Sequence, residues 1–217
     1  MRPRDLPRNA ALAARNFLRS LRRRGLGWVV LPFSGSYPER TVRRDPLPFP
    51  FSRLSLFPSE LSLQGMQAMV DMAAAGGAIM LHENEKAIYG EQPERCLDLH
   101  QTVKGDSFRA TFDPANFVQA GVKPFDDAYP LLKPYIAYFH IKDAIMGEGR
   151  VVPAGKGDGQ IRELMAAAKE VGYDGFLSLE PHLQVAGHSF GFTGPELFGT
   201  AAQALRAILD ELDIPHQ

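Results

Sequence analysis

The sequence predicts a parallel α/β fold, and three observations lead to this prediction. From residue 62 onward, segments with helical periodicity alternate with short apolar runs. The order is α-β-α-β-α-β-α-β-α, which is typical of parallel strands joined by helices. Each of the four apolar runs closes on a residue that can bind a metal ion. With 217 residues, the chain is also long enough to bury a substantial core.

The regular part begins with a helix over 63–75, which Gly76 and Gly77 end before a strand at 78–81. The elements expected next are a helix at 92–103, a strand at 108–112, a short helical segment at 125–132 and a strand at 135–141. A glycine-rich loop at 144–159 is followed by a helix at 160–171 and a strand at 176–179. The final helix should run from Thr193, a capping residue, to about 212, with Pro195 in its first turn.

Residues 1–60 differ in kind from the rest of the chain. They hold 12 Arg, no Lys and 4 acidic residues, whereas 61–217 hold 12 basic and 21 acidic residues. Prolines over 37–50 exclude a helix or a central strand there. A helix at 9–23 superficially resembles a transit segment but is interpreted as a charge-biased tail, and 28–33 and 51–57 are candidate strands. We therefore expect an atypical Arg/Pro-rich segment, 1–60, before a regular domain, 61–217.

The single cysteine, Cys96, excludes an internal disulfide and is typical of a reducing compartment. It is expected to be a packed thiol on the helix after the first strand. No uninterrupted apolar segment is long enough to span a bilayer. The sequence therefore predicts a cytoplasmic protein without a membrane partner, and it leaves open whether the chain forms a homo-oligomer.

Four ligand candidates stand at the ends of the four apolar runs: Glu83, Asp113, His140 and Glu180. They lie 30, 27 and 40 residues apart, which suits successive strand-plus-helix units. Parallel strands bring their carboxyl ends to one edge of a sheet or barrel, and strand alternation places all four on the same face. Three carboxylates and one imidazole suit Mn²⁺ first, with Mg²⁺, Co²⁺ or Zn²⁺ as alternatives. Without a cation, the crowded carboxylates would repel one another.

The motifs LHENEKAIYGE, FDPANFVQAG, YFHIKDA, PAGKGDGQI, GYDGFLSLEPHL and FTGPELFGTAAQALRAIL occur in this order between residues 81 and 209. Together they resemble the xylose isomerase-like TIM-barrel family, in its sugar phosphate isomerase/epimerase branch. The resemblance implies a (β/α)₈ barrel whose metal ligands are Glu83, Asp113, His140 and Glu180. Only 82 residues precede Glu83, whereas about four strands precede its equivalent in the family, so the barrel is expected to be incomplete at its N-terminus.

The resemblance implies a divalent-metal-dependent isomerase or epimerase that acts on a small sugar, sugar phosphate or polyol-derived ketone. Glu83 and Glu180 would exchange the proton next to the carbonyl through an enediolate. Lys142 and His182, which share the parity of the ligands, are substrate-binding candidates, although a solvated lysine or a structural histidine is as good a reading. Asn116 stands where several sugar epimerases carry a further histidine, so an amide would contact the substrate there.

Several alternatives remain at this stage. A dehydratase acting on a cyclic polyol ketone would use the same metal and the same proton abstraction. A DNA endonuclease of the superfamily is disfavoured, because 61–217 is acidic, and no nucleic-acid partner is expected. A non-enzymatic barrel remnant would explain the short N-terminal half. The run from Gly155 to Gly159 is a weak phosphate-loop signal and is interpreted as a mobile active-site loop, with Lys156 as a candidate contact for an acidic substrate.

Overall fold

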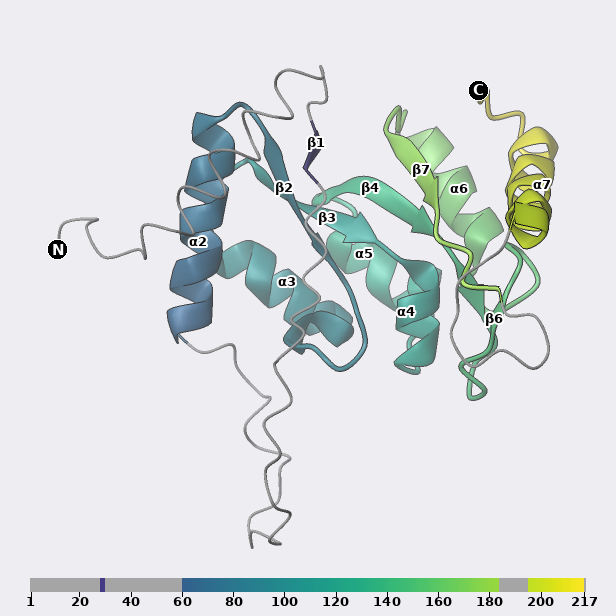
Figure 1. Ribbon diagram of the computed structural model, residues 1–217, viewed down its shortest axis with the longest axis horizontal. Coiled ribbons are helices and arrows are strands. Elements are labelled where there is room, and N and C mark those ends of the chain that lie inside the picture. Colours follow the sequence, from purple (N-terminus) through teal and green to yellow (C-terminus); the bar gives the residue numbers. More distant parts are fainter. Residues whose placement is uncertain (1–27, 30–59, 184–194, 217) are drawn as a thin grey trace, which may run out of the picture.

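The computed structural model describes residues 28–29, 60–183 and 195–216 of the chain. Within this part, one parallel sheet has the strand order β1-β2-β3-β4-β7 (Figure 1). Its strands are β1 (Trp28–Val29), β2 (Ile79–Glu83), β3 (Phe108–Phe112), β4 (Ile136–Ile141) and β7 (Phe176–Leu179). Every pairing in the sheet is parallel, so the predicted architecture is confirmed. The short strand β1 lies within the candidate strand 28–33 and pairs with β2.

Helices connect the strands and follow the sheet from α2 at one end to α7 at the other (Figure 1). They are α2 (Glu60–Ala75), α3 (Pro93–Thr102), α4 (Pro114–Gln119), α5 (Tyr129–Leu132), α6 (Ile161–Glu170) and α7 (Pro195–Glu211). A 3₁₀ turn, η2 (Tyr89–Glu91), precedes α3, and a π-helix, η3 (Pro124–Ala128), precedes α5. The predicted helices are confirmed to within about three residues at each end. The expected helix at 9–23, the strand at 51–57 and the Thr193 cap lie outside the described residues.

Helix α4, the strands β5 and β6 and the turn η2 were not predicted from the sequence. Helix α4 has six residues, which is too few for a helical period to stand out. It begins at Pro114, and the carboxylate of Asp113 caps it by accepting a hydrogen bond from the backbone N–H of Asn116 at 2.9 Å. The glycine-rich loop contains an antiparallel hairpin of two-residue strands, β5 (Asp143–Ala144) and β6 (Val151–Val152).

The main core lies between the sheet and the helices that cover one of its faces. Phe112, Phe139 and Ile141 point to this side and are at most 2% exposed. They pack against residues of α4, α6 and α7, such as Phe117 and Leu164. Burial of each side chain of this size stabilises the fold by roughly 2–3 kcal/mol.

The opposite face of the sheet carries the polar positions. The register pairs Glu83 with Thr111, Thr111 with Tyr138, and His140 with Ser178. These residues therefore share one face, as strand alternation predicts. Among the described residues, no helix is long and apolar enough to cross a membrane.

Candidate metal centre

Four strands of the sheet deliver one polar ligand candidate each to the same place. Glu83 is the last residue of β2, Asp113 directly follows β3, His140 is in β4, and Glu180 directly follows β7. One side-chain ligand atom from each of these residues lies within 4.8 Å of the others. The meeting of four strand ends follows from the parallel sheet, because all its strands end at the same edge.

Asp113 is the most deeply buried member of the cluster, with no exposed surface. Its Oδ1 accepts the N–H bond that caps α4. Its Oδ2 lies 2.9 Å from the Nζ of Lys142, but among the described residues no hydrogen bond of regular geometry reaches this buried oxygen. Burial raises the pKa of Asp113, and the ammonium of Lys142 opposes this effect.

His140 lies at the centre of the cluster. Its Nδ1 is 2.9 Å from Glu83 Oε1, 3.7 Å from Glu180 Oε2 and 4.0 Å from Asp113 Oδ2. Burial alone lowers the pKa of His140, but the hydrogen bond to Glu83 and the surrounding carboxylates raise it above its ordinary value. The raised pKa means that the surrounding carboxylates favour the protonated, positively charged form of the His140 imidazole.

Lys142 lies inside the cluster. Its side chain is 2% exposed, and its Nζ is 2.6 Å from Glu180 Oε2 and 2.9 Å from Asp113 Oδ2. Burial lowers the pKa of Lys142, but the two carboxylates more than offset this and raise it. Conversely, burial raises the pKa of Glu180, while Lys142 holds it below its usual range. Glu180 is therefore ionised at neutral pH.

The other two predicted site residues have different surroundings. His182 is half-exposed, and its Nε2 lies 3.5 Å from Glu180 Oε1. Its φ of +39° is a left-handed backbone conformation that is uncommon outside glycine. Asn116 is 1% exposed; its Nδ2 donates to Glu83 Oε1 at 3.3 Å and to the backbone carbonyl of Asn84 at 2.9 Å. The side-chain amide of Asn116 thus holds the carboxylate of Glu83 by a hydrogen bond.

Asn84 is a residue of the centre that sequence reasoning missed. Its Nδ2 donates to the backbone carbonyl of Asp113, and its Oδ1 accepts from the backbone N–H of Asp113, both at 2.8 Å. This reciprocal pair ties the end of β2 to the end of β3. The available signal was an asparagine directly after Glu83 at a strand end, but its partner lies 29 residues away in the sequence.

The glycine-rich loop is organised around an internal carboxylate. Asp143 has no exposed surface and accepts hydrogen bonds from the backbone N–H groups of Gly155, Gly157 and Gly159 at 2.8–3.0 Å, as well as from Ala144 at 2.8 Å. A side chain at Gly157 would collide with the Ala144 carbonyl oxygen and with Asp143. These amides are therefore already paired, which excludes the phosphate-loop reading for them. Lys156 is exposed.

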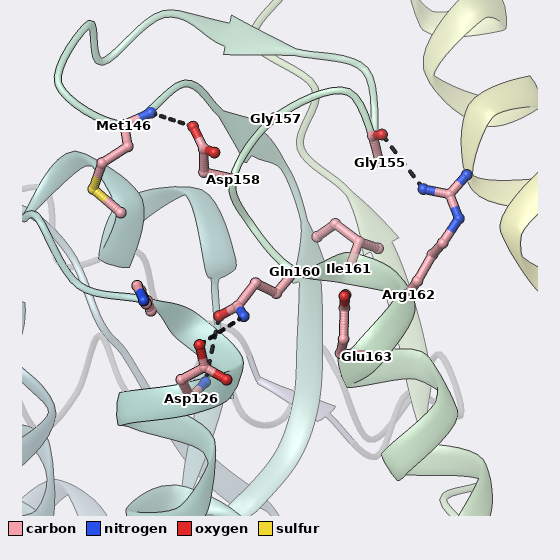
Figure 2. A pocket seen from close by; sticks show the side chains of 10 residues that line it. Asp126, Met146, Gly155, Gly157, Asp158, Gln160, Ile161, Arg162 and Glu163 are labelled. Atoms are coloured by element: carbon pink, nitrogen blue, oxygen red, sulfur yellow. Dashed lines mark hydrogen bonds between the residues drawn. The ribbon is translucent and has the colours of Figure 1, made fainter.

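A cavity of about 420 Å³ lies beside this loop, next to the N-terminus of α6 (Figure 2). None of the four ligand candidates lines it. Its polar side chains are largely paired: Asp158 accepts the N–H of Met146 at 2.7 Å, and Gln160 donates to Asp126 at 3.1 Å. The cavity is separate from the candidate metal centre.

The donor set of the cluster fits a divalent ion. Three carboxylates and one imidazole are oxygen and nitrogen donors that Mn²⁺, Mg²⁺, Co²⁺ and Zn²⁺ accept. The buried Asp113 Oδ2, which lacks a regular hydrogen bond among the described residues, has lone pairs available for a metal ion.

Cys96 does not belong to this set of metal-ligand candidates. It is packed as predicted: it is 2% exposed, donates to the Gly90 carbonyl at 3.0 Å, and burial raises its pKa to about 12.

Comparison with protein families identifies the chain. The family model described as "Xylose isomerase-like TIM barrel" matches residues 59–213. The chain belongs to this family. The resemblance and the fold class that the sequence predicted are therefore confirmed. Among curated proteins, no match is found.

Solved structures of this xylose isomerase-like family align with most of the chain. A xylose isomerase domain protein from Planctomyces limnophilus has 18% identity and a TM-score of 0.63, with 93% of this chain and 65% of that chain covered. A D-tagatose 3-epimerase-like protein has 18% identity and a TM-score of 0.66, with coverages of 94% and 71%. The IOLI protein with a bound zinc atom has 16% identity and a TM-score of 0.64, with coverages of 96% and 73%. At these identities the similarity shows the fold, and the chain spans about two thirds to three quarters of these proteins' lengths.

Proposed function

We propose that this chain is a divalent-metal-dependent isomerase or epimerase of a small sugar, sugar phosphate or polyol-derived ketone. The observation that carries the proposal is the convergence of Glu83, Asp113, His140 and Glu180 within 4.8 Å at the ends of four parallel strands. The similar structures support it, because one is named as epimerase-like and another contains zinc. Mn²⁺ is the ion we expect first, with Mg²⁺, Co²⁺ or Zn²⁺ as alternatives.

The four residues of the cluster would hold the ion. When bound, a divalent ion polarises a substrate carbonyl and acidifies the neighbouring C–H. The remaining chemistry is proton transfer, which we assign to Glu83 and Glu180. Glu83 ends β2 and Glu180 directly follows β7, and these strands are separated in the sheet by β3 and β4, so the two carboxylates reach the centre from opposite sides.

Glu180 is the proton acceptor in this proposal. Lys142 keeps the pKa of Glu180 below its usual range, so a charged carboxylate is available at neutral pH. Glu83, carrying a proton taken from solvent, would deliver it from the other side to the enediolate, and Glu180 would then release the abstracted proton to solvent. Return to a different face of the same carbon gives an epimer, and return to the neighbouring carbon gives an isomer.

Two further residues support this chemistry in different ways. His182 is half-exposed beside Glu180, so we assign it to substrate hydroxyl groups. Asn116 is buried against Glu83, so we assign it to holding that carboxylate in place, and not to direct substrate contact as the sequence suggested.

The test is solvent-proton exchange. The protein is incubated with Mn²⁺ and a panel of ketoses, ketose phosphates and inososes in D₂O, and NMR follows deuterium entering next to the carbonyl. We expect exchange with at least one ketone and a loss of at least about 100-fold in Glu180→Gln. Glu148→Gln is the matched control, because Glu148 is exposed and, within the part of the chain that the structure describes, its carboxylate pairs with Arg150 alone. The product distinguishes isomerase, epimerase and the alternative dehydratase, which would release water.

A non-enzymatic remnant is the opposing interpretation. It would show no exchange with any ketone in the panel, even though circular dichroism reports a folded chain and calorimetry reports bound Mn²⁺. That combination would overturn the proposed activity.

A further inference from the structure

The ammonium of Lys142 contacts two of the four ligand candidates, Asp113 and Glu180. It lies 2.6 Å from Glu180 Oε2 and 2.9 Å from Asp113 Oδ2, and its side chain is 2% exposed. Asp113 is fully buried, so solvent does not screen this pair. The contacts of Lys142 are therefore made with two of the four ligand candidates themselves.

The negative charges of the cluster explain why the ammonium of Lys142 stabilises it. Three carboxylates meet with ligand atoms within 4.8 Å of one another, and like charges this close repel strongly where water is largely excluded. His140 pairs with Glu83 at 2.9 Å, which leaves Asp113 and Glu180 to Lys142. Each carboxylate of the cluster thus has a cationic or potentially cationic partner within the chain.

We propose that Lys142 is a counter-cation that competes with the divalent ion for Asp113 and Glu180. This inference rests on the proposed function, because it concerns the same metal centre. The ammonium keeps the metal-free site folded by neutralising two buried carboxylates. A divalent ion bound to those oxygens meets a nearby positive charge, so Lys142 lowers the affinity for the metal and keeps its binding reversible.

Isothermal titration calorimetry of the metal-free full chain with Mn²⁺ tests this inference, alongside thermal unfolding in EDTA. In Lys142→Met, which keeps the length of the side chain but removes its charge, we expect Mn²⁺ to bind on the order of tenfold or more tightly. We also expect the metal-free Tm to fall. Equal or weaker Mn²⁺ binding in Lys142→Met would overturn the inference.

Two comparison variants separate the site from general charge effects. Lys86→Met removes the same charge from an exposed lysine that pairs with Glu85, and it should leave the Mn²⁺ Kd within about twofold, because solvent screens that charge. Glu180→Gln should greatly weaken Mn²⁺ binding both in the parent chain and in Lys142→Met, and this result would place the ion at Glu180. If the parent chain binds no Mn²⁺ at all, the proposed metal centre fails and the inference fails with it; if the parent binds but Lys142→Met binds no tighter, only the inference fails.

The Lys142→Met variant could prove unfolded when no metal is present. In that case, added Mn²⁺ should restore a cooperative unfolding transition, because the ion replaces the missing ammonium. Failure of Mn²⁺ to restore folding would contradict the proposed exchange of one cation for another.

Discussion

Asp113 directly follows β3, and Asp143 lies two residues after the end of β4. Both aspartates are fully buried, but their carboxylate oxygens have different partners. Asp143 accepts four backbone N–H bonds, two on each carboxylate oxygen. Asp113 accepts one N–H bond on Oδ1, and its Oδ2 faces the ammonium of Lys142 without regular hydrogen-bond geometry. Burial raises the pKa of both.

The difference separates a structural carboxylate from an available one. Both carboxylate oxygens of Asp143 already accept hydrogen bonds from the backbone of the glycine-rich loop, so this carboxylate has few lone pairs left to bind a ligand. The Oδ2 atom of Asp113 can still accept a ligand, and a metal cation can replace the ammonium of Lys142 beside it. Burial alone does not distinguish these roles; the partners of each oxygen do.

The largest expected effect is at Asp143. Asp143→Asn turns one of its two acceptor oxygens into a donor that faces N–H groups, which should lower the free energy of unfolding by roughly 3–4 kcal/mol. Urea unfolding followed by circular dichroism measures this loss. A change below about 1 kcal/mol would mean that the loop does not depend on this carboxylate.

Loss of the tie between β2 and β3 should come next. Asn84→Ala removes both bonds to the backbone of Asp113 and leaves its buried N–H and carbonyl unpaired, so we expect a loss of about 2 kcal/mol. The Mn²⁺ Kd should also rise, because Glu83 and Asp113 are no longer held in register. Asn84→Asp, which can still accept from the N–H of Asp113, should recover part of the affinity in calorimetry. Affinity unchanged in Asn84→Ala would show that Asn84 is only structural.

His100 is a third buried polar side chain, and it extends the contrast between the two aspartates to a group whose burial is not offset by hydrogen bonds from the described residues. Both of its ring nitrogens are buried without a hydrogen bond among the described residues, and its ring packs between Phe108 and Tyr135. Burial lowers its pKa from 6.5 to about 3, helped by nearby His82 and Arg109. His82, whose burial lowers its pKa to about 4, behaves in the same way.

Below pH 6.5 the unfolded chain therefore binds protons that the folded chain refuses, so stability falls as the pH drops from 6.5 toward about 3. Each such histidine contributes a slope of up to about 1.4 kcal/mol per pH unit. His100→Phe should reduce this slope in urea titrations between pH 6.5 and 4.5 while preserving the aromatic packing. An unchanged slope would show that His100 is accessible to protons in the folded state.

The smallest effect on stability is expected at Asp113, in contrast with Asp143. Asp113→Asn preserves the cap of α4, relieves repulsion between the crowded carboxylates and leaves Lys142 paired with Glu180, so no buried charge is left uncompensated and the metal-free protein should change in stability by less than about 1.5 kcal/mol. The rise in Tm on adding Mn²⁺ should nevertheless disappear. A large loss of metal-free stability together with a retained Mn²⁺ response would reverse the roles assigned to the two aspartates.

Much of this arrangement is readable from the sequence because it is local or periodic. Alternation within each apolar run places Glu83, Thr111 and His140 on one face, and the order of elements predicts the parallel sheet that brings the strand ends together. The chain therefore determines by itself which residues can meet at the centre. The division at residue 60 remains a prediction, although Trp28 and Val29 of the N-terminal segment join the sheet.

What pairs with each polar group was decided only by the tertiary structure. The sequence pattern predicts a ligand role for Asp113 and no role for Asp143, but it identifies the partners of neither carboxylate. Their roles depend on partners that are distant along the chain: Lys142 for Asp113, 29 residues away, and Gly155 to Gly159 for Asp143, 12 to 16 residues away. Hydrogen bonds are directional and short-ranged, so their geometry exists only once the strands and loops have packed.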